Sequence, residues 1–226
     1  MLANNFALQF IIVALLGTWI ANNVKQVTVI YFIKYNLQLE PYFGLILLGV
    51  ILQIMLGALA TNLIKNMFEK KIIFIMGTAL YVVTDLIIYF ITGYENFWLF
   101  AFVGSFGFIG FGMAGVATWS MLADSVEFGE WKSGFRSEGI INSSFVCIFK
   151  LSIGFSGWLA GMILESTNYQ PNEVMQNSET LEGLFIMGYI FPAVAGTIAM
   201  LIMAFHRYDS SFYDTVFSDL RSERKS

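Results

Sequence analysis

Three charged side chains stand inside long apolar runs of this sequence. Lys25 follows Asn22 and Asn23, Asp85 follows a run of β-branched and aromatic residues, and Lys150 lies in the apolar segment 145–154. A charge at the centre of a bilayer costs about 2.5–3.5 kcal/mol on insertion scales, so such residues are kept for ion pairs, polar cavities or transport pathways. These positions are where we look first for function.

Lys150 lies about midway along its apolar run, too deep to reach the interface easily. We favour a cation that lines a polar cavity, where it contacts a substrate hydroxyl or carboxylate or pairs with an acid on another helix. The alternative is a purely structural ion pair between helices. Asp85 has three readings of similar weight: it pairs with a basic group, faces a water-filled vestibule, or makes a structural polar contact.

Around Lys25, polar and aromatic residues alternate. Lys25, Asn23 and Gln26 cannot all face lipid, and Tyr31 follows near the outer end of the run. Our hypothesis is that this face lines a pathway that binds polyhydroxyl ligands by hydrogen bonds and aromatic stacking. The alternative for the tyrosine is anchoring at the outer membrane interface.

A second cluster of charges falls between two apolar runs, where Phe128 and Trp131 interrupt it. Acids at the C-terminal end of a helix oppose the helix dipole, so they need basic partners, such as Lys132, Arg136 or a residue elsewhere. The charged residues of the cluster are Asp124, Glu127, Glu130, Lys132, Arg136 and Glu138.

The elements that hold these residues are predicted to be transmembrane helices. The chain has 226 residues, of which 57% are hydrophobic and only 12% charged. About 20 apolar residues cross a bilayer as a helix, and runs apolar on all sides argue against a transmembrane barrel. We expect an all-α integral membrane bundle, residues 1–207, and a cytoplasmic tail, 208–226. Its six spans are predicted at about 6–33, 42–64, 71–92, 97–122, 138–164 and 183–205.

The distribution of Lys and Arg predicts the orientation. Positive charges collect in the second and fourth connections and in the tail, whereas the opposite side has only Lys34. Under the positive-inside rule both termini are therefore cytoplasmic, and we expect a multi-pass protein of the cell (inner) membrane.

Composition excludes several classes of protein. A formal net charge of −4 gives no basic face for nucleic acid. The single Cys147 leaves no disulfide framework or thiolate zinc site, and the single His206 leaves little room for histidine-based catalysis or metal binding. A membrane-embedded enzyme, such as an intramembrane protease or transferase, is the alternative, but no HExxH motif or catalytic Ser/His arrangement is present. We therefore expect neither an enzyme nor a bound organic cofactor.

The charged cluster resembles a known family. The segments Trp119–Asp124 and Glu127–Lys132, followed by Arg136 and by Glu138-Gly139, are similar to the glycoside–pentoside–hexuronide:cation symporters, of which melibiose permease is a member. The resemblance covers essentially the whole chain. It extends to Lys25 with the segment Tyr31–Tyr35, to Lys150, to Asn168–Asn172, to Tyr208 and to Asp219–Arg221.

The resemblance implies a major facilitator fold of twelve helices in two halves, each a 3+3 inverted repeat. This chain is similar to the C-terminal half, so an N-terminal six-helix half, in the same gene or a separate chain, is the implied partner. Most of the family's cation-binding acids belong to that other half. Two positions depart from the family pattern: Glu69 replaces a glycine of the second connection, and Glu127 stands where Asp is common.

The family also implies roles for particular residues. The cytoplasmic gate is carried over to Asp124, Glu127, Glu130, Arg136 and Glu138. Lys150 is carried over as the lysine near the sugar and cation sites, and with Lys25, Asn23, Tyr31 and Trp119 it forms the expected substrate and cation pathway.

The expected function is symport of a sugar or glycoside with a cation by alternating access. Sodium, proton and lithium remain open as the coupling ion, as do the sugar and any metal ligands in this chain. The alternatives are a non-transporting membrane scaffold or sensor, and a truncated, decayed transporter.

Overall fold

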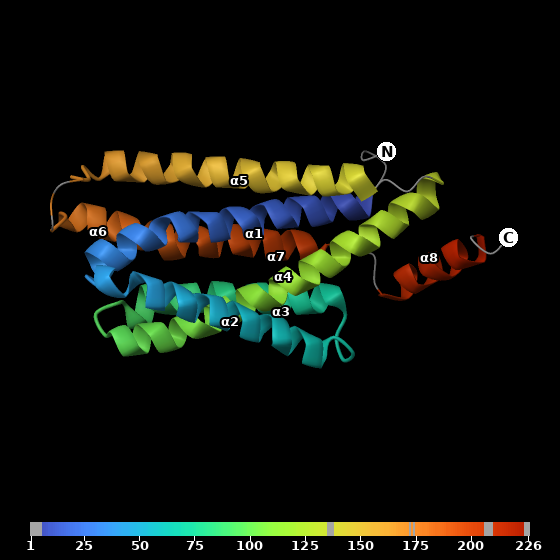
Figure 1. Ribbon diagram of the computed structural model, residues 1–226, viewed down its shortest axis with the longest axis horizontal. Coiled ribbons are helices and arrows are strands. Elements are labelled where there is room, and N and C mark those ends of the chain that lie inside the picture. The colour runs from blue at the N-terminus through green and yellow to red at the C-terminus, as the bar shows by residue number, and fades with distance from the viewer. Residues whose placement is uncertain (1–5, 135–137, 172, 174, 206–209, 224–226) are drawn as a thin grey trace.

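The computed structural model describes residues 6–134, 138–171, 173, 175–205 and 210–223, and every regular element in those ranges is helical, which confirms the all-α prediction (Figure 1). The main helices are α1 (Phe6–Tyr31), α2 (Phe43–Ile64), α3 (Lys70–Ile87), α4 (Phe97–Ser133), α5 (Glu138–Ser166), α6 (Ser178–Phe185), α7 (Phe191–Ala204) and α8 (Ser210–Glu223).

Five helical segments of the described chain are long and apolar enough to cross a membrane, so this is a multi-pass membrane protein. They are Glu40–Ile64, Lys70–Thr92, Phe97–Lys132, Glu138–Ser166 and Ser178–Ala204. Helix α1, which carries Asn22, Asn23 and Lys25, is not among the five. A sixth crossing by α1 therefore stays a prediction.

The helices pack as two interlocked groups. Helix α4 lies against α2 and α3, helix α1 lies against α5 and α7, and α3 meets α7 between the two groups (Figure 1). The start of α1, the α2–α3 connection, the end of α4 and helix α8 all lie at one end of the molecule. That end also carries Lys65, Lys70 and Lys71.

Glycines let the backbone of α4 approach both of its neighbours. A Cβ added at Gly112 would lie 2.2 Å from the Ile54 carbonyl oxygen of α2, and one at Gly110 would lie 2.5 Å from the Gly77 carbonyl oxygen of α3. Only glycine fits at such distances, because small residues let membrane helices pack closely. The same contact is repeated from the other side at Gly57 and Gly77.

The glycines of α5 behave differently. A Cβ at Gly154, Gly157 or Gly161 would meet no described atom within 4 Å. The GxxxG pattern of this helix therefore packs against nothing in the described part of the chain, and its small residues lie on an open face.

Three π-helical turns meet at the end of the bundle opposite α8. They are Phe32–Asn36 after α1, Ile88–Thr92 after α3, and Ile186–Ile190 between α6 and α7. Each brings a large side chain into one buried cluster, in which the Phe32 and Phe185 rings stack with centroids 5.9 Å apart. Turns of this type occur frequently at functional sites. The buried members of the cluster are Phe32, Ile88, Phe185 and Tyr189.

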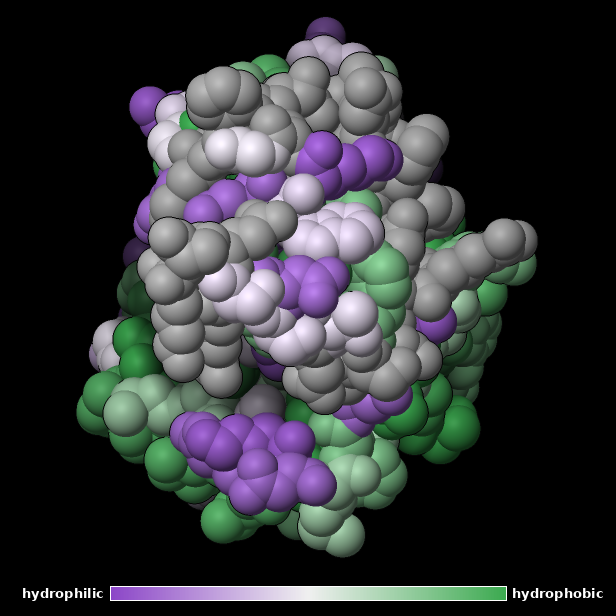
Figure 2. Space-filling view, turned by 90° about the vertical axis from the view of Figure 1, so that its right-hand side faces the viewer, coloured by the Kyte–Doolittle hydropathy of each residue, from purple (hydrophilic) through white to green (hydrophobic). Residues whose placement is uncertain are grey.

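At the other end, α4 continues past residue 122, where the fourth span was predicted to end, to Ser133. This extension forms a platform for α8: Phe128 is buried with Tyr213 and Val216, and the Trp131 indole donates a hydrogen bond of 3.1 Å to the Asp219 carboxylate. Figure 2 shows hydrophilic residues gathered on this end and hydrophobic residues along the flank.

Replacing Gly112 by Ala is expected to destabilise the bundle, because the new methyl group would overlap the α2 backbone. Overpacking of this kind typically costs about 1–3 kcal/mol. The measurement is the thermal unfolding midpoint of the detergent-purified protein. The matched control on the same helix is Gly115→Ala, whose Cβ would meet nothing within 4 Å. Equal midpoints for the two variants would contradict the close α2–α4 contact.

Candidate functional site

A buried ion pair joins α1 to α3. The Lys25 ammonium donates to the Oδ1 oxygen of Asp85, and the Asp85 side chain is 0% exposed. The other carboxylate oxygen, Oδ2, is buried without a hydrogen-bond partner among the described residues. Of the readings left open for Asp85, the pairing with a basic group is the one found. Removal of one partner of such a pair costs about 3–5 kcal/mol, because a lone buried charge remains.

Aromatic rings surround the Lys25 ammonium. Its nitrogen lies 4.7 Å from the Tyr81 ring centroid, 4.8 Å from that of Tyr189 and 5.3 Å from that of Phe108. The rings come from α3, from the π-helical turn before α7, and from α4. Such contacts stabilise a cation, and more strongly where water is excluded. Three segments of the chain besides α1 therefore contact this one charge.

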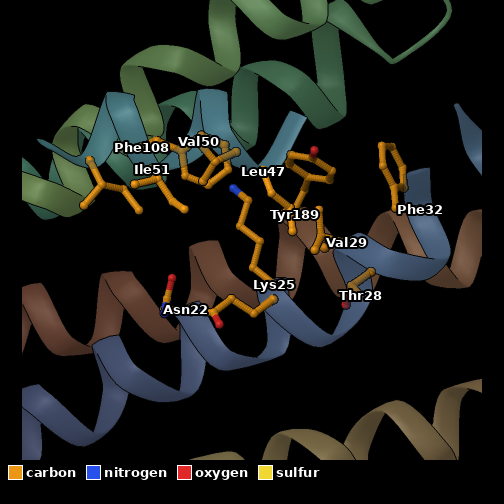
Figure 3. A pocket seen from close by; sticks show the side chains of 13 residues that line it. Asn22, Lys25, Thr28, Val29, Phe32, Leu47, Val50, Ile51, Phe108 and Tyr189 are labelled. Atoms are coloured by element: carbon orange, nitrogen blue, oxygen red, sulfur yellow. The ribbon is translucent and has the colours of Figure 1, made fainter. Parts of the chain in front are cut away.

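Two cavities meet at Lys25. The smaller has a volume of about 300 Å³ and includes Asn22, Gln26 and Thr28 in its lining. The larger, about 950 Å³, extends toward the end of the bundle opposite α8 and includes Gln53 and Glu95. Figure 3 shows the Lys25 side chain reaching from α1 toward Val50 and Phe108. Cavities of about 300–1,000 Å³ are typical of small-molecule sites, and polar groups in an apolar wall fix the ligand's orientation.

Asn23 faces away from these cavities and joins α1 to α5. Its amide nitrogen donates a 2.8 Å hydrogen bond to the buried Ser152 hydroxyl. One turn earlier, the Trp19 ring packs edge-on against Phe149 with centroids 4.7 Å apart. Asn23 lines neither cavity and instead satisfies a polar contact between helices.

Tyr31 belongs to a group of three tyrosines at the end of α1. Its ring lies edge-on to Tyr169, 5.8 Å between centroids, and the Tyr169 hydroxyl shares a 2.8 Å hydrogen bond with that of Tyr35. Burial, followed by the bond to Tyr35, raises the pKa of Tyr169, so this phenol stays protonated at neutral pH. The group ties α1 to the α5–α6 connection and does not line the cavities described above.

Lys150 and Trp119 lie on the surface of the bundle, away from Lys25. Lys150 is exposed on α5, and none of the described residues forms an ion pair or hydrogen bond with it. Trp119 of α4 is 53% exposed, and its ring packs on Phe145 with centroids 4.5 Å apart. An exposed ammonium at membrane depth has to face a polar partner or water.

The charged cluster is anchored by a second ion pair. Asp124 near the end of α4 is buried and accepts from the Lys70 ammonium at the start of α3, with distances of 2.7 and 2.8 Å to its two oxygens. Glu127 and Glu130 are half-buried on the same extension, and Glu138 is exposed at the start of α5. Arg136 lies outside the described residues.

Sequence reasoning missed Lys70 as the partner of Asp124 and the three rings around Lys25. The sequence spacing could have linked one of these rings, that of Tyr81, to the ion pair. Tyr81 precedes Asp85 by one helical turn, which places both on one face of α3. No comparable signal links Phe108 or Tyr189 to Lys25, because both belong to other helices and come close only through tertiary packing.

A family profile described as "MFS/sugar transport protein" matches residues 1–210. Three curated proteins illustrate the similarity. The chain is 34% identical to "Uncharacterized symporter YjmB" of Bacillus subtilis (strain 168), over 82% of this chain and 40% of that protein. It is 31% identical to "Putative sulfoquinovose importer" of Escherichia coli (strain K12), over 89% and 42%. It is 28% identical to "Isoprimeverose transporter" of Lactiplantibacillus pentosus, over 84% and 40%.

The chain therefore spans less than half the length of these relatives. Across five of the similar proteins, the matched part covers between 40% and 48% of the relative.

Asp85→Asn is expected to lower the thermal unfolding midpoint of the purified protein, because the Lys25 ammonium then remains buried without its counterion. The cost is about 3–5 kcal/mol if no other group compensates. The double variant Lys25→Met with Asp85→Asn removes both charges and is expected to recover most of that loss. Additive losses in this double-mutant cycle, measured by thermal unfolding, would show that the two residues are not coupled.

Proposed function

The chain belongs to the MFS/sugar transport protein family, which confirms the resemblance in its charged motif, and from that premise we propose that it is the C-terminal half of a sugar:cation symporter. The transported molecule is a sugar or glycoside, the coupling ion is sodium or a proton, and transport follows alternating access. The observation that carries the proposal is a buried charged residue, Lys25, held between two cavities of ligand size in a family of sugar transporters.

The chemistry of the cavities supports a sugar ligand. The amide groups of Asn22 and Gln26 and the Lys25 ammonium stand in a largely apolar wall, and the Phe108 and Tyr189 rings lie beside them. This combination offers hydrogen bonds to sugar hydroxyls and flat faces for the ring. Two of the relatives, the putative sulfoquinovose importer and the isoprimeverose transporter, have sugars in their names.

Helix packing supports a 3+3 inverted repeat. Helix α1 contacts α5 and α7, and helix α4 contacts α2 and α3 in the same manner. In chain order, the first three spans are α1, α2 and α3, and the second three are α4, α5 and α6 with α7. The first span of each set therefore packs on the second and third spans of the other set. An exchange of this kind is what two repeats related by a pseudo-two-fold axis produce.

Exposure of α2 and α5 supports a partner half. Only 6% of the most apolar stretch of α2 is buried and 17% of that of α5, against 50% for α3. The glycine face and the exposed Lys150 belong to the uncovered surface of α5. A second six-helix half, packed on α2 and α5, would complete the cavity wall and give Lys150 a polar environment.

The end of the bundle that carries α8 is rich in lysine, and this supports a cytoplasmic orientation and a gate at that end. Lys65, Lys70 and Lys71 lie at the end that carries α8, so we assign this end to the cytoplasm and the protein to the inner membrane. The Lys70–Asp124 pair, which clamps α3 to α4 there, is the anchor of the proposed cytoplasmic gate with Glu127, Glu130, Glu138 and Arg136.

Coupling requires that the cation favour the state that binds sugar. The test is uptake of labelled sugars by vesicles that contain the transporter to which this chain belongs, with an imposed sodium or proton gradient. Uptake above the gradient-free level is the expected result. Sugar uptake that is independent of both gradients would rule out coupling to sodium or protons. The absence of uptake for every sugar would favour a scaffold or sensor.

Lys150→Ala is expected to lower gradient-driven uptake at least about tenfold, because a cation exposed at membrane depth is retained for a polar contact. Membrane abundance, measured by immunoblot, is expected to stay unchanged. The matched control is Leu151→Ala, the neighbouring exposed residue of α5. Wild-type uptake by the lysine variant would exclude Lys150 from the pathway.

A further inference from the structure

The larger cavity is a crevice between α2 and α4. The two helices are in backbone contact where a Cβ added at Gly57 would lie 2.1 Å from the Ile109 carbonyl oxygen. The cavity-lining residues of both helices precede this contact in the chain, within Leu45–Gln53 of α2 and Phe97–Phe108 of α4. The crevice therefore starts beside the helix contact and extends toward the end of the bundle opposite α8.

The mouth of this crevice is lined by polar and aromatic residues that lie apart from the smaller cavity. Gln38 belongs to the connection between α1 and α2, and Tyr94 and Glu95 belong to the connection between α3 and α4. None of the three lines the smaller cavity. Amide and carboxylate groups bind hydroxyls, and aromatic rings offer a flat apolar face, so this combination suits a sugar ring.

Asn36 supplies an acceptor at the mouth that is unused within the described structure. Its amide nitrogen donates a 3.0 Å hydrogen bond to the Leu181 carbonyl of α6, which fixes the orientation of the side chain. Its Oδ1 oxygen is buried and has no hydrogen-bond partner among the described residues, and Asn36 lines the larger cavity. A buried acceptor without a donor is costly, and a ligand hydroxyl would supply the donor.

The Tyr94 ring is held in place beside this acceptor. It packs edge-on against Phe32, with ring centroids 5.4 Å apart, and against Phe185, with centroids 5.1 Å apart. Tyr94 is half-buried against this aromatic cluster and also lines the larger cavity. A ring that is already ordered loses little entropy when a ligand binds, so it is a prepared contact surface.

We propose that the mouth of the larger cavity is a second sugar site, separate from the one beside Lys25, where a neutral sugar binds before it moves inward. Asn36 and Glu95 accept hydrogen bonds from its hydroxyls, and Tyr94 contacts its ring. The inference rests on the proposed function and deepens it by adding a site on the path of the transported sugar. The larger cavity has a volume of about 950 Å³ and the smaller about 300 Å³, so a ligand that fits the smaller occupies only part of the larger.

Charge at the mouth favours a neutral sugar over an anion. Two charged residues line the larger cavity in the described part of the chain, Lys25 at its inner end and Glu95 at its mouth. Lys25 is paired with Asp85, whereas Glu95 is exposed and forms no ion pair with a described residue. A carboxylate accepts strong hydrogen bonds from hydroxyls and repels a second negative charge.

The experiment measures how well a sugar protects a cysteine at the mouth, Gln38→Cys, from a membrane-impermeant maleimide. It uses the full transporter that contains this chain, in right-side-out vesicles, and labelling at position 38 is read by mass spectrometry. The neutral probes are glucose and isoprimeverose, the anionic probe is sulfoquinovose, and betaine at equal osmolality is the blank. A neutral sugar is expected to protect, and sulfoquinovose is expected to need at least about tenfold more for half-protection. Glu95→Gln is expected to reduce that difference.

Variants separate the mouth from the inner site. Glu95→Leu is expected to weaken protection by a neutral sugar at least about tenfold and Asn36→Leu about fivefold, the loss of one hydrogen bond each. Gln26→Leu alters the smaller cavity only and is expected to keep the protection. The matched control is Glu40→Gln, an exposed acid that is 3.9 Å from Lys34 and does not line the cavity. If Asn36→Leu does not fold, the exposed Glu95 decides.

Uptake gives a readout that a structural role would not move in the same way. Glu95→Leu is expected to raise the KM for a neutral sugar about tenfold and to lower kcat by less than about twofold, because the mouth captures sugar before the inner step. Protection that is lost in Gln26→Leu and kept in Glu95→Leu would overturn the inference while sugar transport stands. Uptake of a neutral sugar that does not protect position 38 would do the same. Failure of all three sugars in both uptake and protection would overturn the proposed function and this inference together.

Discussion

The cost of burying charge in a membrane organises this molecule. Lys25 and Asp85 are tolerable at membrane depth only as a pair, and that pair requires α1 and α3 to lie within side-chain reach of each other. The rings of Tyr81, Phe108 and Tyr189 then fill the space around the ammonium, which draws α4 and the turn before α7 into the same contact. One ion pair thus ties together four segments far apart in the sequence, and the cavities lie beside it.

Close backbone contact supplies the stability that hydrophobicity cannot, because lipid is as apolar as the helices themselves. The contacts are distributed unevenly. Helix α4 uses Gly110 and Gly112 to press against α3 and α2, whereas Gly154 and Gly157 of α5 touch nothing in the described chain. One side of the fold is therefore locked by backbone contact, and the other is left open. In the proposed transporter, the open side is where the second half would pack.

The two ends of the bundle are held together by different kinds of contact. At the end with α8, Lys70 and Asp124 form a pair in which the lysine is partly exposed and the acid is buried, and α8 packs on the extension of α4 beside it. At the opposite end, π-helical turns and aromatic rings form a buried cluster, and the larger cavity extends toward that end. The ion pair at Lys25 lies between the end that carries the Lys70–Asp124 pair and the end that carries the aromatic cluster.

The sequence by itself determined the helical class, the membrane location and the family, because apolar runs of bilayer length and a long charged motif are local properties of the chain. It also singled out Lys25 and Asp85 by the cost of their burial. Only the tertiary structure decided that these two residues pair, that Lys70 meets Asp124, that Asn23 faces α5, and that Lys150 lies on an open surface. The physical reason is that a polar residue in a span needs a partner, whereas the identity of that partner depends on which helices pack together. That choice is made by glycine contacts and ring packing between segments distant in the sequence.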